Sequence, residues 1–260
     1  MAEKTVLLDR KGGVATLTLN RPEVYNALNR ELVDELAAGL RAVAADPAVR
    51  CLVLTGSGKA FCAGGDLGHL RELTDAGDFR RFIQDAGALA AALLNLEKPV
   101  VAMVNGVAAG AGFNLALACD IVIAARSARF AQSFAKVGLV PDCGGLYLLP
   151  RVVGIHKAKE LMFTADTIDA ATARQLGIVN RLTDDGDLAA EAAAFAAKLA
   201  AGPPVALGCM KKVLSRTFDL DLDAVLDREA DLQTICAATA DYAEGVAAFR
   251  EKRPPVFTGK

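Results

Sequence analysis

The chain has 260 residues, of which 53% are hydrophobic, so it can bury a core without disulfides or a structural metal. A formal net charge of −2 and a pI of about 5.8 exclude a global basic field of the kind that attracts nucleic acid or anionic membranes. Six scattered cysteines without a Cys-x-x-Cys pair, and only two histidines, predict no metal site and a reduced, cytoplasmic protein. We expect no secretory signal in the opening "MAEKTVLLDRKGG", and no apolar stretch predicts a membrane span.

Strands and helices alternate over the first three quarters of the chain. One helix is predicted because apolar residues recur at helical spacing and Asn29 can cap its first turn. The strands are predicted from short β-rich or apolar runs bounded by glycine or charge. In chain order, the sequence predicts a hairpin over 5–20, helices over 30–44 and 79–95, and strands over 51–56, 99–106, 121–125, 128–132 and 177–183.

From about residue 187 the pattern is almost wholly helical. Four segments rich in Ala and Leu predict helices over 188–200, 204–216, 222–238 and 241–253. Alternating strands and helices followed by helices alone predict an α/β core over residues 1–195 and a helical C-terminal region over 196–260. The apolar faces of these helices require burial on the core or on another subunit.

Two stretches share one plan, "CLVLTGSGKAFCAGGDL" and "VVAMVNGVAAGAGFNLALACD". Each is a predicted buried strand, then a glycine turn, then small residues that open a helix. Small residues let a ligand approach the main chain, and a helix start leaves N–H groups unpaired, so two such loops can form an oxyanion hole. The alternative is that these residues only allow tight packing. A P-loop is excluded, because Val53 and Ala60 stand where that motif requires Gly and Ser or Thr.

"GSGKAFCAGGDL" and "KPVVAMVNGVAAGAGFNLALACDIVIAA" closely resemble the enoyl-CoA hydratase/isomerase (crotonase) superfamily, and the likeness covers nearly the whole chain. The resemblance implies a spiral of ββα units with a helical tail that builds trimers, usually paired into hexamers. It also implies an acyl-CoA thioester as ligand and no cofactor, since coenzyme A is part of the substrate. The N–H groups of Gly65 and Ala111 are implied to hold the thioester oxygen.

In hydratases of this family two glutamates flank the substrate, and Asn114 and Phe134 stand at the matching positions. An ordinary hydratase is therefore disfavoured. Asp142 stands where other branches place an acid/base aspartate, including the dienoyl-CoA isomerases. "RFAQSFAKVGLVPDCGGLYLLPRVVG" and the ending "ADYAEGVAAFREKRPPVFTGK" most resemble the branch of ring-epoxide isomerases, the 1,2-epoxyphenylacetyl-CoA isomerases.

A single carboxylate suits isomerisation, because one base can take a proton from one carbon and return it to another. We expect desolvation to raise the pKa of Asp142. The alternative is that Asp142 only caps the helix that begins at Gly144. Two further functions stay open: a hydratase in which Asp142 and a bound water replace the glutamates, and a non-catalytic acyl-CoA-binding subunit.

Further residues are candidates for binding the substrate and its CoA group. Asp66 is also expected to cap a helix beside the oxyanion donor, and His69 can face either the acyl pocket or a helix surface. Ordinary surface solvation is the alternative for each basic residue. The candidates are Arg21, Lys59, Ala63, Asp66, Leu67, Gly110, Phe249 and Lys252.

Overall fold

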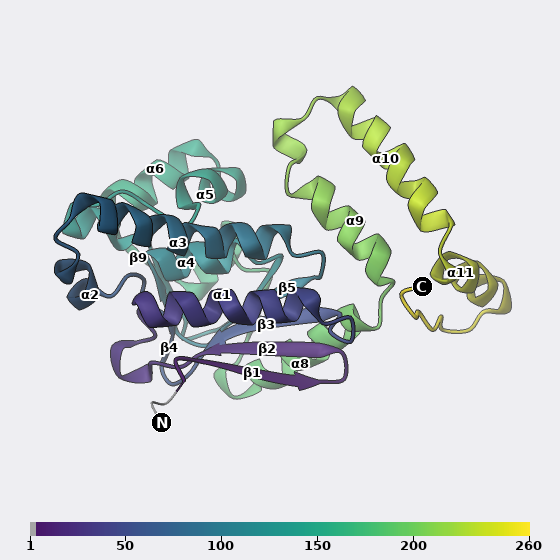
Figure 1. Cartoon of the computed structure of the whole chain (residues 1–260), viewed down its shortest axis with the longest axis horizontal. Coiled ribbons are helices and arrows are strands. Elements are labelled where there is room, and N and C mark those ends of the chain that lie inside the picture. The colour runs from purple at the N-terminus through teal and green to yellow at the C-terminus, as the bar shows by residue number, and fades with distance from the viewer. Residues whose placement is uncertain (1–3) are drawn as a thin grey trace.

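The computed structural model of the chain describes residues 4–260, so the first three residues of the predicted core lie outside the described residues. A six-stranded sheet runs in the order β1-β2-β3-β5-β7-β10; Figure 1 labels its strands β1, β2, β3 and β5. The first two strands form the predicted antiparallel hairpin, and every later pair of neighbours is parallel. The strands are β1 (Val6–Lys11), β2 (Val14–Leu19), β3 (Cys51–Gly56), β5 (Val100–Val104), β7 (Ile121–Ala125) and β10 (Arg181–Thr183).

A second, four-stranded sheet runs in the order β4-β6-β8-β9. Each of its strands has three residues, which is too short to give a periodic signal in the sequence. Of these strands the sequence predicted β8, within residues 128–132. The strands are β4 (Ala60–Cys62), β6 (Val107–Ala109), β8 (Arg129–Ala131) and β9 (Thr167–Asp169).

The predicted ββα spiral is confirmed. Three times, a strand of the large sheet is followed by a strand of the small sheet and then by a helix: β3-β4-α2, β5-β6-α4 and β7-β8-α5. Successive units lie side by side in parallel, as in the pairing of β4 with β6. The loops that follow β4 and β6 therefore leave the small sheet next to each other.

Helices α1 and α3 pack side by side over one face of the large sheet (Figure 1). The predicted cap of α1 is confirmed, because Asn29 Oδ1 accepts a hydrogen bond from the N–H of Leu32 at 3.0 Å. Helix α3 starts three residues before the prediction, since Asp75 caps it instead. The helices of this part are α1 (Arg30–Ala45), α2 (Leu67–Glu72), α3 (Ala76–Asn95), α4 (Ala111–Leu117), α5 (Gly145–Val153), α6 (Ile155–Thr164) and α7 (Ala170–Gln175), with short 3-10 helices at Pro22–Val24, Ser133–Val137 and Asp185–Asp187. A further 3-10 helix, Thr217–Asp219, lies in the C-terminal region.

Helix α8 (Leu188–Ala200) covers the other face of the large sheet. Its small residues Ala192 and Ala196 lie in one buried cluster with Val53, Val101 and Ile123 of the strands. Because alanines carry short side chains, the helix can approach the sheet closely. The sequence predicted that the α/β core ends at residue 195 and the C-terminal region begins at residue 196. Helix α8 continues through both positions, so residues on both sides of this boundary pack against the sheet.

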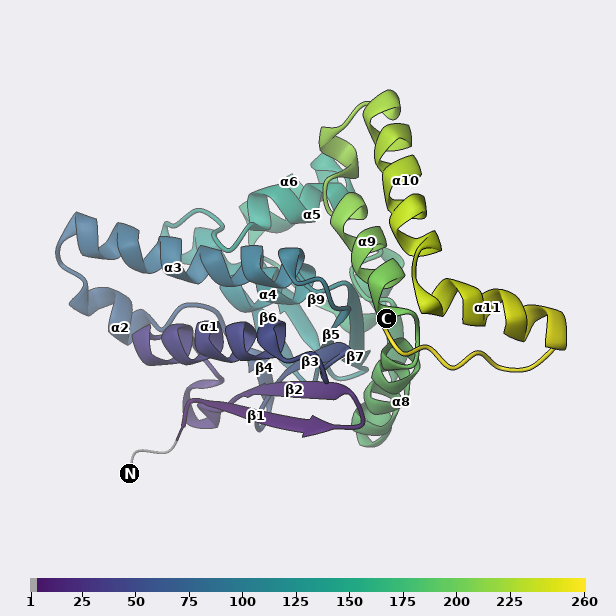
Figure 2. The same cartoon turned by 45° about the vertical axis from the view of Figure 1, so that its right-hand side comes forward.

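The last three helices, α9 (Pro204–Leu214), α10 (Leu222–Ala237) and α11 (Ala240–Glu251), lie on the side opposite to α2 (Figures 1 and 2). Helix α9 contacts the core, because the buried Lys211 donates to the carbonyl oxygen of Leu93 at 2.8 Å and pairs with Asp120 at 2.8 Å.

The chain then returns, and Arg50 donates hydrogen bonds to the carbonyl oxygens of Phe257 and Thr258 at 2.8 and 2.9 Å. The buried carboxylate of Asp241 accepts from the N–H of Thr258 at 2.6 Å. Residues 252–260, called the tail below, thus connect α11 to the core.

Within residues 4–260 no single helix is both long and apolar enough to cross a membrane. The two segments Asp185–Ala200 and Pro204–Leu214 reach that length and apolar character only when taken together, and the angle between them is 104°.

Candidate active site

The two glycine loops meet each other in the structure. Gly64 has a φ of +100°, and a Cβ atom on it would lie 2.9 Å from the carbonyl oxygen of Ala109 and 3.3 Å from the nitrogen of Ala111. Only glycine fits both this backbone conformation and this spacing. The close approach brings Gly65 of the first loop next to the start of α4 in the second.

The N–H groups of Gly65 and Ala111 are free to bind a ligand. Gly65 sits in a bridge to Leu28, but the hydrogen bonds of that bridge run from Leu28 N to Gly64 O at 2.7 Å and from Asp66 N to Leu28 O at 2.9 Å. Ala111 is the first residue of α4, so its N–H has no partner within the helix. Within residues 4–260 neither N–H donates to another backbone group. Two such donors on touching loops can stabilise an oxyanion.

Asp66 caps α2 directly after the first loop, as predicted. Its Oδ1 accepts from the N–H groups of Gly68 and His69 at 3.0 and 3.3 Å, and its Oδ2 accepts from Arg21 at 3.0 Å. Burial alone would raise the pKa of this carboxyl, but the hydrogen bond from Arg21 and those from the backbone hold it below its ordinary value. The pair of Arg21 and Asp66 therefore fixes the loop that presents Gly65.

Asp142 lies on the loop that enters α5. The chain turns there through two consecutive left-handed residues, Cys143 with φ +45° and Gly144 with φ +77°. The cap residue of α5 is Gly144, without a side-chain cap, which contradicts the alternative that Asp142 serves as the helix cap. Within the described residues, Asp142 Oδ1 is buried and has no hydrogen-bond partner.

The environment of Asp142 makes it a better base than an exposed aspartate. Burial raises its pKa, as the sequence predicted, and the Cys143 thiol and the Asp142 N–H offset only part of that effect. Its negative charge also contributes to the raised pKa of Cys62, at the end of β4. The carboxylate charge thus acts on a thiol at the start of the first glycine loop.

The two positions that hold glutamates in hydratases carry no carboxyl group here. Asn114 is completely buried, and its amide donates to the carbonyl oxygen of Asp142 at 2.8 Å. Its Oδ1 accepts from Gln132 at 2.7 Å. Phe134 is a buried ring beside Gly110, whose Cβ, if present, would lie 3.6 Å from it. Neither side chain can exchange a proton as a carboxyl does.

The remaining candidates fall into three places. Ala63, Leu67 and Gly110 lie on the two loops or at the start of α2, beside the free N–H groups. Lys59 is exposed at the opposite end of β4. Arg21 is occupied by Asp66 and by the carbonyl oxygen of Ala27, at 2.6 Å. Roles of these residues in binding CoA stay predictions.

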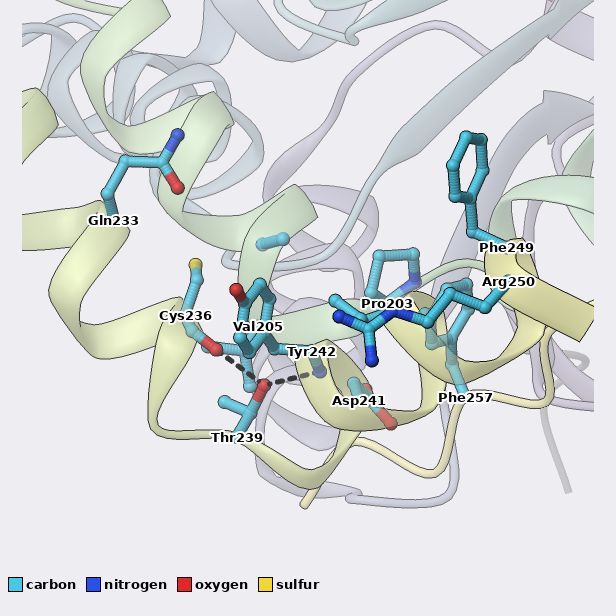
Figure 3. A pocket seen from close by; sticks show the side chains of 13 residues that line it. Pro203, Val205, Gln233, Cys236, Thr239, Asp241, Tyr242, Phe249, Arg250 and Phe257 are labelled. Carbon is cyan, nitrogen blue, oxygen red and sulfur yellow. Dashed lines mark hydrogen bonds between the residues drawn. The ribbon is translucent and has the colours of Figure 1, made fainter.

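Phe249 lies on α11 and Lys252 follows its last residue, and the two views place α11 at the other end of the molecule from α2 (Figures 1 and 2). Phe249 is 86% exposed and lines an apolar pocket of about 510 Å³ between α9, α10, α11 and the tail (Figure 3). The fold of one subunit therefore does not bring them to Asp142.

Two polar side chains complete the surroundings of the site. His69 packs edge-on against Phe82, with ring centres 4.8 Å apart, and its Nε2 is buried and has no partner within residues 4–260. Gln132 was not predicted, because a lone glutamine at a strand end carries no sequence signal. Its contact with Asn114 spans 18 residues of sequence and is visible only in the folded chain.

Proteins of similar sequence and structure point to one family. The enoyl-CoA hydratase/isomerase family matches residues 9–260. The chain is 46% identical over 255 residues to 1,2-epoxyphenylacetyl-CoA isomerase of Escherichia coli K12, covering 95% of this chain and 96% of the relative. It is 38% identical over 265 residues to crotonyl-CoA hydratase of Syntrophomonas wolfei, covering both chains completely. The crystal structure of an enoyl-CoA hydratase from Mycobacterium smegmatis is similar with a TM-score of 0.94 at 36% identity, covering 98% of this chain and 99% of that one.

Proposed function

Because the chain belongs to the enoyl-CoA hydratase/isomerase family, we propose that it is an enoyl-CoA isomerase with Asp142 as its acid/base. It moves a double bond, or rearranges a ring, in an acyl-CoA thioester. One observation carries the proposal: the loop that enters α5 holds a carboxyl whose Oδ1 is buried without a partner in the described chain, and burial raises its pKa. The two positions at which hydratases have glutamates hold Asn114 and Phe134.

The chemistry needs one proton carrier and one oxyanion hole. The Asp142 carboxylate takes a proton from the carbon next to the thioester carbonyl, and the electron pair moves onto the thioester oxygen. The N–H groups of Gly65 and Ala111 stabilise the resulting enolate, a type of contact worth roughly 3 to 4 kcal/mol per donor. The protonated Asp142 then returns the proton two carbons further along the chain, and the double bond shifts.

Hydration is the second candidate function, and the 38% identical crotonyl-CoA hydratase favours it. Adding water requires that one group activates the water and another protonates carbon. With Asn114 tied to the Asp142 backbone, Asp142 would have to do both through a bound water. Of the two relatives described above, 1,2-epoxyphenylacetyl-CoA isomerase is more similar to this chain than crotonyl-CoA hydratase, at 46% against 38% identity.

We further propose that the protein works in the cytoplasm as a homotrimer or hexamer. The exposed apolar residues of the C-terminal helices support this, among them Phe218 and Phe249, which are 73% and 86% exposed. In such an assembly Phe249 and Lys252 would meet the CoA nucleotide of a neighbouring subunit. Light scattering combined with gel filtration tests the assembly, and a monomer at micromolar concentration would refute it.

Incubation with a 3-enoyl-CoA in heavy water, followed by mass spectrometry, tests the function. The wild type should give a 2-enoyl-CoA, with deuterium at carbon 4 in those turnovers in which protonated Asp142 exchanges with the solvent before it returns the proton. Asp142→Asn should lower the rate by about 10² to 10⁴. A hydrated product would favour the hydratase. Wild-type protein that neither moves a double bond nor exchanges a proton, in aliphatic and aromatic acyl-CoAs alike, would favour the non-catalytic subunit.

A further inference from the structure

We propose that Asn114 and Gln132 are positioning residues that hold the Asp142 carboxyl in its buried place by fixing the peptide behind it. The inference rests on the proposed function, since it assigns roles toward the acid/base. It explains why the chain keeps two completely buried amides, 0% and 1% exposed, beside its active-site loop.

The first contact is a clamp on the Asp142 carbonyl oxygen. That oxygen accepts from the N–H of Gly145 at 2.9 Å and from the Asn114 amide at 2.8 Å. Gly145 has no room for a side chain, because a Cβ there would lie 2.3 Å from Asn114 Nδ2. The amide of Asn114 therefore lies flat against the first residue of α5, and the loop is held from two sides.

The second contact fixes which way the Asn114 amide faces. An amide turned by 180° would present its oxygen to the Asp142 oxygen, and two acceptors repel each other. Gln132 prevents this turn, because its Nε2 donates to Asn114 Oδ1 at 2.7 Å. Gln132 Oε1 is left buried without a partner in the described chain, an arrangement that costs stability. A purely structural glutamine would gain nothing from this arrangement.

The clamp acts next to a strained backbone position. Cys143 follows Asp142 with a φ of +45°, in the left-handed region that non-glycine residues rarely adopt. Without the Asn114 donor the loop can relax, and the carboxyl can turn toward water. Both changes move the base away from its proton and lower its pKa, because burial is what raises that pKa.

The titratable groups beside the Asp142 carboxyl do not obscure its titration in a pH–rate profile. These are the thiols of Cys143 and Cys62. Burial raises the pKa of Cys143 well above its ordinary value and that of Cys62 to about 12, so both stay protonated over the working pH range. The acidic limb of the pH–rate profile then belongs to Asp142.

The variants Asn114→Leu and Gln132→Met test the inference, since each removes the donor at similar volume. We expect Asn114→Leu to lower kcat by about 10- to 100-fold with KM within about threefold, because a small misplacement of a catalytic group costs this much. Gln132→Met should lower kcat less, and the double variant should be no worse than Asn114→Leu, since the two act in series. The acidic limb should move to lower pH in all three.

Thr55→Val is the matched control. Thr55 Oγ1 donates to the Met103 carbonyl oxygen at 2.8 Å, so this variant also removes one mostly buried side-chain bond to backbone. It should lower stability and leave kcat unchanged. If the Asn114 and Gln132 variants likewise lose only stability, with kcat and the acidic limb unchanged, the inference is overturned.

A second readout separates this inference from the proposed function. In protein labelled with ¹³C at aspartate carboxyls, the Asp142 signal is assigned by its loss in Asp142→Asn, and its pKa is measured by NMR. A lower pKa in Asn114→Leu and Gln132→Met supports positioning even without a known substrate. An unchanged pKa refutes it, whereas a fully active Asp142→Asn refutes the proposed function instead.

Discussion

The contact between the two glycine loops gives a sharp test of the oxyanion hole through Gly64→Ala. The Cβ of the new residue would lie 2.9 Å from the carbonyl oxygen of Ala109, closer than such atoms approach in real proteins. The clashing atom is backbone, so the loop or β6 has to move by several tenths of an ångström. Because Gly65 and Ala111 sit on these two segments, the distance between their N–H groups changes.

The cost can be divided into two parts. A left-handed backbone at an alanine costs about 1–2 kcal/mol, and overpacking adds about 1–3 kcal/mol. Gly12→Ala is the control for the first part, because Gly12 has a φ of +57° in the β1–β2 turn and nothing within 4 Å of its missing Cβ. We expect Gly64→Ala to lose about 2–5 kcal/mol and Gly12→Ala about 1–2 kcal/mol.

Urea unfolding followed by circular dichroism measures the stability, and kcat is measured well below each melting temperature. A displaced donor should lower kcat of Gly64→Ala by about 10² or more, whereas Gly12→Ala should keep the wild-type kcat. A folded Gly64→Ala protein with wild-type kcat would refute the assignment of these loops as the oxyanion hole.

Three further predictions concern carboxyl groups. Because burial raises the pKa of Asp142, the free energy of unfolding of Asp142→Asn should exceed that of wild type at pH 8. The difference should vanish below about pH 4, where the wild-type carboxyl is protonated in both the folded and the unfolded protein. If urea unfolding gives the variant and wild type the same free energy at pH 8 as well as at low pH, the burial argument is contradicted. Asp66→Ala should lose about 1–2 kcal/mol at pH 7 through the missing cap, and because the pKa of Asp66 is lowered, this loss should shrink as pH falls through that pKa. Asp241→Ala should free the tail at Thr258, so limited proteolysis should remove the last residues faster than from wild type. An equal rate would show that the remaining contacts, with Arg50 and Glu244 among them, hold the tail without Asp241.

The sequence predicted the long elements well and the short ones poorly. Helix α1 and the hairpin were predicted within about one residue, because several turns or an alternating run give a repeated signal. The three-residue strands β4, β6 and β9 and the six-residue helix α7 carry no such repetition. Strand β10 is shorter than predicted because Gly177, with a φ of +81°, turns the chain before it.

The same distinction holds for the candidate site. Gly65, Ala111 and Asp142 were predicted because each lies in a contiguous motif. Arg21 shows the limit, since an arginine after a strand looks the same in sequence whether it binds a phosphate or, as here, Asp66 at 3.0 Å. Contacts that join distant segments depend on the packing of whole units, and no local pattern reports them.

The ββα arrangement itself explains how one fold can relocate its acid/base group. Ala111 opens α4 and Asn114 follows three residues later, on the same side of the helix. Whatever side chain stands at position 114 is therefore held at a fixed place relative to the thioester oxygen. A carboxyl there can act on the substrate directly. The amide in this chain is instead turned to the loop before α5, where it accepts from Gln132 and supports Asp142. Under the proposed function, position 114 no longer carries the proton but holds Asp142, the group that does, and the oxyanion hole stays in place.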